Sequence, residues 1–72
     1  MEVARHRVYV IVRDALGAVV ARRYVGSESV PVWLKTTAGS DGVRCDVYDE
    51  APDCGGRIVT TLIPRGRSWE QQ

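Results

Sequence analysis

Alternation of residue types along several short segments constrains the fold of this chain more than any other feature. Between Arg7 and Arg13, valines occupy every second position while arginine, tyrosine and isoleucine fill the others. Segments 30–35 and 43–48 repeat the pattern, with valine, cysteine or leucine alternating with proline, charged or aromatic residues. Successive side chains of a β-strand point to opposite faces of its sheet. We therefore predict a sheet with one apolar face and one aromatic, basic face.

Turn-forming residues divide the chain into five predicted strands. Strands at this regular spacing predict an all-β fold, namely a five-stranded antiparallel meander closed into a small barrel or a compact sandwich, with little or no helix. Pro31 indicates that at least the start of the third strand lies at a sheet edge. The predicted strands are 7–13, 18–25, 30–37, 43–48 and 57–63.

The segment after the first strand admits two interpretations. Asp14 and Gly17 favour a type I turn with a bulge, after which the next strand returns antiparallel and places Arg23 opposite Tyr9. The apolar residues of 15–25 also follow helical spacing, so a helix with Asp14 as its N-cap is the alternative. Gly17 would then lie in the first helical turn, which favours the hairpin.

The length of 72 residues predicts one small domain over 1–64 and a tail over 65–72, because Pro64 is expected to end the last strand. A chain this short buries only about 60% of its unfolded surface. Its core alone therefore supplies a net stability of only a few kcal/mol. We expect it to gain stability from a protein partner or from copies of itself, as a homo-oligomer.

The residues expected on the aromatic, basic face, together with the tail, form the candidate partner-binding site. Trp, Tyr and Arg dominate the hot spots of protein interfaces, and the same residue types stack bases and bind phosphates. We predict a non-enzymatic protein-interaction or self-assembly module, with a small nucleic-acid-binding β-barrel as the alternative. The simpler explanation for the face residues is that they fill a second small hydrophobic core. For the tail, the simpler explanation is a frayed terminus. The candidates are Arg7, Tyr9, Arg13, Trp33, Lys35, Arg44, Tyr48, Arg65, Arg67 and Trp69.

Catalysis and metal binding find little support. The single histidine, His6, lies between two arginines, and no serine or cysteine has a base nearby in the sequence. We therefore expect no enzyme and no cofactor. Cys45 and Cys54 are too few to close a structural zinc site. A disulfide between them would suit an exported protein, whereas thiols are expected in the cytoplasm.

Charge and hydropathy bear on partners and location. The net charge of +1 gives no general argument for nucleic acid, and the acidic residues concentrate in 41–53. No apolar run approaches the length of about 18 residues that a membrane span needs. No hydrophobic signal precedes the first strand, so the cytoplasm is expected. Nine of the ten basic residues are arginine, which is typical of a GC-rich genome, such as that of a bacterium or its phage.

Overall fold

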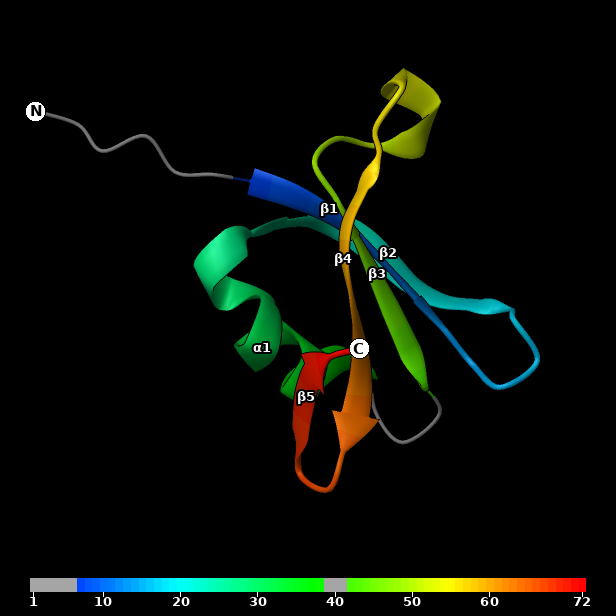
Figure 1. Ribbon diagram of the computed structural model, residues 1–72, viewed down its shortest axis with the longest axis vertical. Helices are drawn as coiled ribbons and strands as arrows, with labels where there is room; N and C mark the ends of the chain where they lie inside the picture. Colours follow the sequence, from blue (N-terminus) through cyan, green and yellow to red (C-terminus); the bar gives the residue numbers. More distant parts are fainter. Residues whose placement is uncertain (1–6, 39–41) are drawn as a thin grey trace, which may run out of the picture.

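Five antiparallel strands form a sheet, and a short helical segment lies against one of its faces (Figure 1). This computed structural model describes residues 7–38 and 42–72. The strands are β1 (Arg7–Arg13), β2 (Val19–Gly26), β3 (Arg44–Tyr48), β4 (Ile58–Arg65) and β5 (Ser68–Gln71). Their order across the sheet is β2-β1-β3-β4-β5, so β2 and β5 are the two edges.

The predicted hairpin is confirmed, and the alternative helix over 15–25 is wrong. The Asp14 carboxylate accepts hydrogen bonds from the backbone N–H groups of Leu16 and Ala18, both at 2.9 Å. Gly17 has a φ of +86°, a left-handed conformation that glycine adopts without strain. Asp14 and Gly17 therefore set the turn that returns β2 along β1.

The register of this hairpin differs by one residue from the expected one. A bulge leaves Val20 without a partner in β1, so Tyr24, rather than Arg23, lies opposite Tyr9. A one-residue shift moves each side chain of a strand to the other face of the sheet. The bulge therefore places Tyr24 and Arg22 on the same face as Tyr9, and Arg23 on the opposite face.

The predicted third strand over 30–37 is wrong, because this part of the chain is helical. The chain forms a 3-10 turn η1 (Ser27–Ser29), a single turn α1 (Val30–Trp33) and a π-helical turn η2 (Leu34–Ala38). Pro31 lies in the first turn of α1, where no backbone N–H donor is needed. The expectation of little or no helix therefore fails for this segment.

Burial within the helical segment follows helical spacing rather than alternation. Val30, Trp33 and Leu34 are buried, at the i, i+3 and i+4 positions that share one side of a helix. Val32, which alternation would place beside Val30, is 65% exposed. The apolar residues of this segment fit both the two-residue alternation of a strand and the i, i+3, i+4 spacing of a helix. In the structure they follow the helical spacing.

The core lies between the helical segment and one face of the sheet. Its buried residues from the helical segment are Val30, Trp33 and Leu34. The partly buried Leu62 and Trp69 extend the core towards β4 and β5. The predicted apolar alternation is confirmed for Val10, Val12, Cys45 and Val47, which form the sheet side of the core with Val25. It fails for Val43, which is 40% exposed.

The predicted barrel or sandwich is wrong, because the described strands form an open sheet with the helical segment in place of a second sheet. The chain is also not a simple meander, since β1 lies between β2 and β3. Pro64 does not end its strand, because β4 continues to Arg65. Residues 68–71, expected in a tail, pair with β4 as the edge strand β5. No described helix is long and apolar enough to cross a membrane.

Candidate partner-binding face

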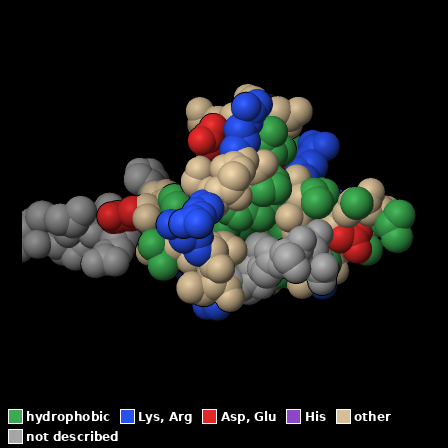
Figure 2. All heavy atoms as spheres, turned by 90° about the horizontal axis from the view of Figure 1, so that it is seen from below, with side chains coloured by type: hydrophobic (Ala, Val, Ile, Leu, Met, Phe, Trp, Pro, Cys, Tyr) green, Lys and Arg blue, Asp and Glu red, His purple; other side chains and the backbone are tan. Residues whose placement is uncertain are grey.

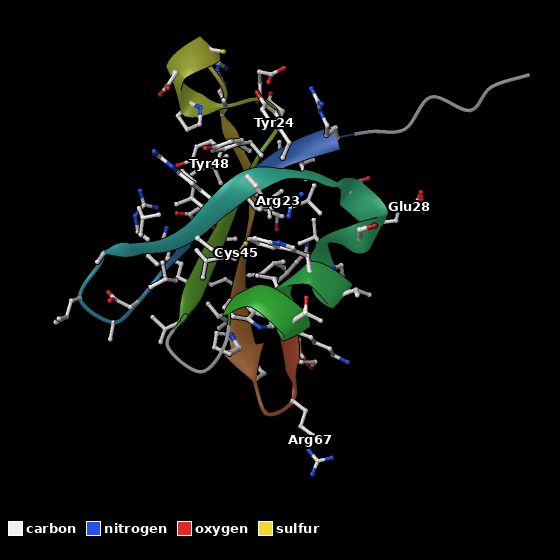
Figure 3. All side chains as sticks on the ribbon, turned by 180° about the vertical axis from the view of Figure 1, so that it is seen from behind. Arg23, Tyr24, Glu28, Cys45, Tyr48 and Arg67 are labelled. Atoms are coloured by element: carbon white, nitrogen blue, oxygen red, sulfur yellow. The ribbon has the colours of Figure 1, made fainter. Side chains whose placement is uncertain are left out.

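The three tyrosines of the chain form a row on the sheet face that the helical segment leaves uncovered. Tyr9 in β1 lies opposite Tyr24 in β2 and opposite Tyr48 in β3. The rings of Tyr9 and Tyr24 meet edge to face, with centroids 4.9 Å apart. Figure 3 labels Tyr24 and Tyr48. All three side chains are half-buried, and this tyrosine row extends across three neighbouring strands.

A hollow of about 330 Å³ opens beside the tyrosine row. Ile11, only 7% exposed, gives it an apolar lining. The connection between β3 and β4, which contains the 3-10 turn η3 (Pro52–Cys54), forms part of its rim. This tyrosine hollow is large enough to take a side chain of a partner. Its lining residues are Tyr9, Ile11, Arg13, Arg22, Tyr48, Ala51, Pro52 and Asp53.

A buried carboxylate fixes two arginines on the same face. Asp46 is 3% exposed and binds Arg13 Nη1 at 3.1 Å and Arg44 Nε at 3.0 Å. Thr61 Oγ1 donates a third hydrogen bond to Asp46, at 2.9 Å. Charge-assisted bonds of this kind compensate the burial of a carboxylate. Both arginine side chains remain partly exposed, so their other N–H groups are available to a partner.

Tyr24 connects the tyrosine row to the connection after β3. The guanidinium carbon of Arg7 lies 4.4 Å from the centroid of the Tyr24 ring, in a cation–π contact. The Tyr24 hydroxyl donates a hydrogen bond to Glu50 Oε1. This bond lowers the pKa of Glu50 and raises the pKa of Tyr24 from their usual values. Glu50 is therefore held ionised at this end of the face.

The uncovered face thus has two ends of opposite charge. We call the end next to the β3–β4 connection the acidic end; it carries Asp49, Glu50 and Asp53, with Arg7 as its cation. The other end, the basic end, holds Arg13 and Arg44, which are both paired with Asp46 and have Asp14 beside them. Arg22, which lines the tyrosine hollow with Arg13, is the third arginine of the basic end.

The structure brings together half of the predicted site residues. Arg7, Tyr9, Arg13, Arg44 and Tyr48 share the uncovered face, as their alternation predicts. These five residues come from β1 and β3, the two segments whose alternation was read correctly.

The other half of the predicted site lies elsewhere. The outward placement of Trp33 is wrong, because α1 buries it in the core with 9% exposure. Lys35 lies on the helical segment and lines a separate hollow of about 360 Å³ with Arg67 and Trp69. Trp69 is partly buried against the core, whereas Arg67 extends away from the molecule (Figure 3). Arg65 is exposed at the end of β4.

Sequence reasoning missed Tyr24, Arg22 and Glu50. The first two were assigned to the wrong face because the bulge in β2 was not foreseen. The consecutive valines Val19 and Val20 interrupt the alternation at the position of the bulge, which is the available sequence signal for it. No sequence pattern connects Glu50 to Tyr24.

The two cysteines do not form a disulfide. Both are free; Cys54 is exposed in η3, and burial raises the pKa of Cys45 to about 12. A thiol with so high a pKa is inert at neutral pH. Within residues 7–38 and 42–72, no three acidic, histidine or cysteine side chains are grouped as metal ligands.

Hydrophobic side chains are also exposed at the tip of the β1–β2 hairpin. Leu16 is 94% exposed, and Val19 and Val20 are 47% and 41% exposed. Figure 2 shows hydrophobic side chains gathered at the end of the molecule that this hairpin occupies. Scattered apolar residues are common on protein surfaces, so this tip by itself does not indicate a binding site.

Comparison with protein-family models, with curated proteins and with solved structures finds no match for this chain. Function is therefore inferred from the uncovered face itself. Its components are an aromatic row, an apolar-lined hollow and two oppositely charged ends.

Proposed function

We propose that this chain is a non-enzymatic protein-interaction module that binds a second copy of itself through the uncovered face. The observation that carries the proposal is the tyrosine row beside the tyrosine hollow, on a face over which the helical segment does not lie. Tyrosine and arginine are enriched among the residues that dominate interface energetics. Association would add buried apolar surface to a domain whose own core is small.

The charges of the face support a symmetric pair. A two-fold axis through the tyrosine row would lay the acidic end of one copy against the basic end of the other. Opposite charges at matching positions favour both the encounter and the register of such a pair. The net charge of +1 per chain leaves little overall repulsion between two copies.

The test is the native mass spectrum of the untagged protein, purified without nuclease at low salt. We expect a dimer free of adducts. Tyr48→Ala should weaken the dimer by about 2 kcal/mol, or about 30-fold, as truncation of a hot-spot residue does. Lys35→Ala changes an exposed residue of the helical segment and should leave the dimer unchanged. A monomer at all concentrations, or an equal loss in both variants, would reject self-association through this face.

Nucleic-acid binding is the second candidate function. An open sheet with tyrosines beside arginines is the arrangement on which single-stranded bases stack while cations bind phosphates. Against it, Asp46 is ion-paired with both Arg13 and Arg44 and so offsets part of their positive charge. The three carboxylates of the acidic end also border the face and would repel phosphates. This function predicts binding to a single-stranded oligonucleotide that falls with salt, with a slope of about −0.7 per phosphate neutralised. Absence of binding at low ionic strength would reject it.

A further inference from the structure

The outer edge of β2 presents backbone groups that no described strand pairs with. Val43 N donates to Arg13 O at 2.9 Å, so the backbone groups of Arg13 point towards β3. Hydrogen-bonding direction alternates along an antiparallel strand. The register then directs the backbone groups of Arg23 to β1, and those of Arg22 and Tyr24 to the free edge. Consistently, Arg23 Nε donates to Tyr24 O at 3.3 Å, through its side chain.

A groove runs beside this edge, between β2 and the helical segment. It has a volume of about 290 Å³. Its lining combines apolar residues with Arg23 and Ser29. Figure 3 labels Arg23 on β2, close to the helical segment. The residues that line this β2 groove are Arg23, Tyr24, Val25, Gly26, Ser29, Val32 and Trp33.

Trp33, which lines the β2 groove, carries an unpartnered donor. Trp33 is 9% exposed and lines the groove. Its Nε1 is buried and has no hydrogen-bond partner, and among the described residues it is the one buried side-chain polar atom in this condition. Leaving a buried N–H without an acceptor costs free energy. Because the atom is closed to solvent, a ligand acceptor would remove this cost by displacing part of the groove lining to reach it.

We propose that β2 binds an extended acidic segment of a partner protein, which adds to the sheet as a further strand. The partner residue opposite Arg23 would project towards the helical segment and enter the β2 groove, because side chains alternate across a strand. A glutamate or aspartate at that position accepts hydrogen bonds from Trp33 Nε1 and from the Arg23 guanidinium. The proposed site uses the β2 edge and the face of the sheet that the helical segment covers, whereas the self-association described above uses the other face; Tyr24 and Arg22 border both.

The charge of β2 favours an acidic segment over a second copy of the same strand. Arg22 and Arg23 are both exposed, and neither has an ion-pair partner among the described residues. Pairing β2 with β2 of another copy would bring four arginines close together, and like charges across paired strands are destabilising. Edge strands commonly use such charges to prevent self-pairing. An acidic segment turns the same charges into attraction.

The test is a nuclear magnetic resonance titration of the ¹⁵N-labelled full chain. The probe is the capped peptide acetyl-Ser-Thr-Val-Thr-Glu-Thr-Val-Thr-Ser-amide, and the matched control has glutamine in place of glutamate. Of the two indole N–H signals, that of Trp33 is assigned with the Trp69→Phe variant. We expect the Trp33 indole signal and the amide signals of 22–26 to shift and saturate with the glutamate peptide, and binding to weaken at least tenfold with glutamine.

Two variants separate the groove from general electrostatics. Arg23→Gln should weaken binding at least tenfold, whereas Arg57→Gln, which removes an exposed arginine at the start of the β4 hairpin, should leave binding unchanged. Trp33→Phe keeps an aromatic ring but removes the N–H, and should weaken binding similarly. If Trp33→Phe does not fold, comparing Arg23→Gln with Arg57→Gln still shows whether binding depends on the groove.

Four results would overturn the proposal. One is the absence of saturable shifts, and another is an equal response to both peptides. Equal shifts with acetate at the same carboxylate concentration would indicate a small-anion site instead of strand addition. Shifts at 22–26 that grow with protein concentration alone would indicate a second copy at this edge. Peptide binding that persists in Tyr48→Ala, at a concentration where this variant is monomeric, would show that this site and the self-association face are separate.

Discussion

Tyr24 illustrates how much of the candidate site depends on a single residue. Its ring contacts Tyr9 edge to face and lies under the Arg7 guanidinium, and its hydroxyl binds Glu50. These three contacts join β1, β2 and the connection after β3. A residue that makes several contacts in one place fixes the orientation of its neighbours. Tyr24 therefore orders the acidic end of the uncovered face.

Replacing Tyr24 should change the titration of Glu50. The hydrogen bond from Tyr24 is the main reason that the pKa of Glu50 is lowered from 4.5, so Tyr24→Phe should raise this pKa towards 4.5. A lowered carboxyl pKa stabilises the fold above the usual pKa, and the stabilisation is lost as the pH falls through the folded-state pKa. Tyr24→Phe should therefore reduce the loss of stability in acid.

The measurement is a ¹³C titration of the Glu50 carboxyl group. Tyr9→Phe is the matched control, because the Tyr9 hydroxyl has no hydrogen-bond partner among the described residues and does not contribute to the pKa shift of Glu50. An unchanged Glu50 pKa in Tyr24→Phe would show that the hydrogen bond is absent in solution.

The connection between β3 and β4 is held in place by tight backbone contacts. Gly56 N donates to Ala51 O at 3.0 Å, and Asp49 Oδ1 accepts from Arg57 N at 2.8 Å. A Cβ atom on Gly56 would lie 1.7 Å from the carbonyl oxygen of Glu50. Only glycine allows the two backbone segments to approach this closely. The rim of the tyrosine hollow therefore depends on Gly56.

Gly56→Ala should destabilise the protein more than Gly55→Ala. The first substitution forces backbone atoms apart and should cost about 3 kcal/mol. Gly55 has a φ of +84° but open space around its Cβ position, so alanine there should cost about 1 kcal/mol. Urea denaturation of both variants measures the difference. Equal stabilities would mean that the connection in solution does not bring Gly56 against Glu50.

The elements differ in how well the sequence predicts them, for physical reasons. The strands predicted over 7–13 and 43–48 and the Asp14 turn were predictable, because alternation and turn residues agree there. The second strand was predictable from the turn that precedes it, but not its register, because the bulge interrupts its alternation. Residues 30–37 were misassigned because their apolar residues fit both a strand and a helix, and only packing against the sheet decides between them. The residues on β1 and β3 were placed correctly. Those after the bulge, such as Tyr24, were not, because a one-residue shift reverses the face.

The arrangement of the whole molecule follows from one helical segment and one sheet. The segment covers one face with Val30, Trp33 and Leu34, and it leaves the tyrosine row on the other. A domain of this size has one small core, so each large core residue carries much of the stability. Trp33 is the largest side chain in that core.

Trp33→Ala should leave the protein largely unfolded at room temperature. Truncation of a buried tryptophan costs about 3–5 kcal/mol, which is comparable to the whole stability expected of a domain this small. Val32→Ala is the matched control, because Val32 is 65% exposed on the neighbouring position and should change stability by less than about 0.5 kcal/mol. Circular dichroism during urea denaturation compares the two. An unchanged midpoint for Trp33→Ala would contradict its place in the core.

The strand order has a consequence for how the chain reaches this structure. The pairs β1–β2, β3–β4 and β4–β5 join strands that are neighbours in the sequence, whereas β1–β3 pairing joins two strands separated by β2 and the helical segment. Closing that long loop costs more chain entropy than forming any of the hairpins, and non-local pairings of this kind slow folding. We therefore expect the β1–β3 junction to form late in folding, when two locally formed halves become one sheet. The three tyrosines come into line only when that junction has formed.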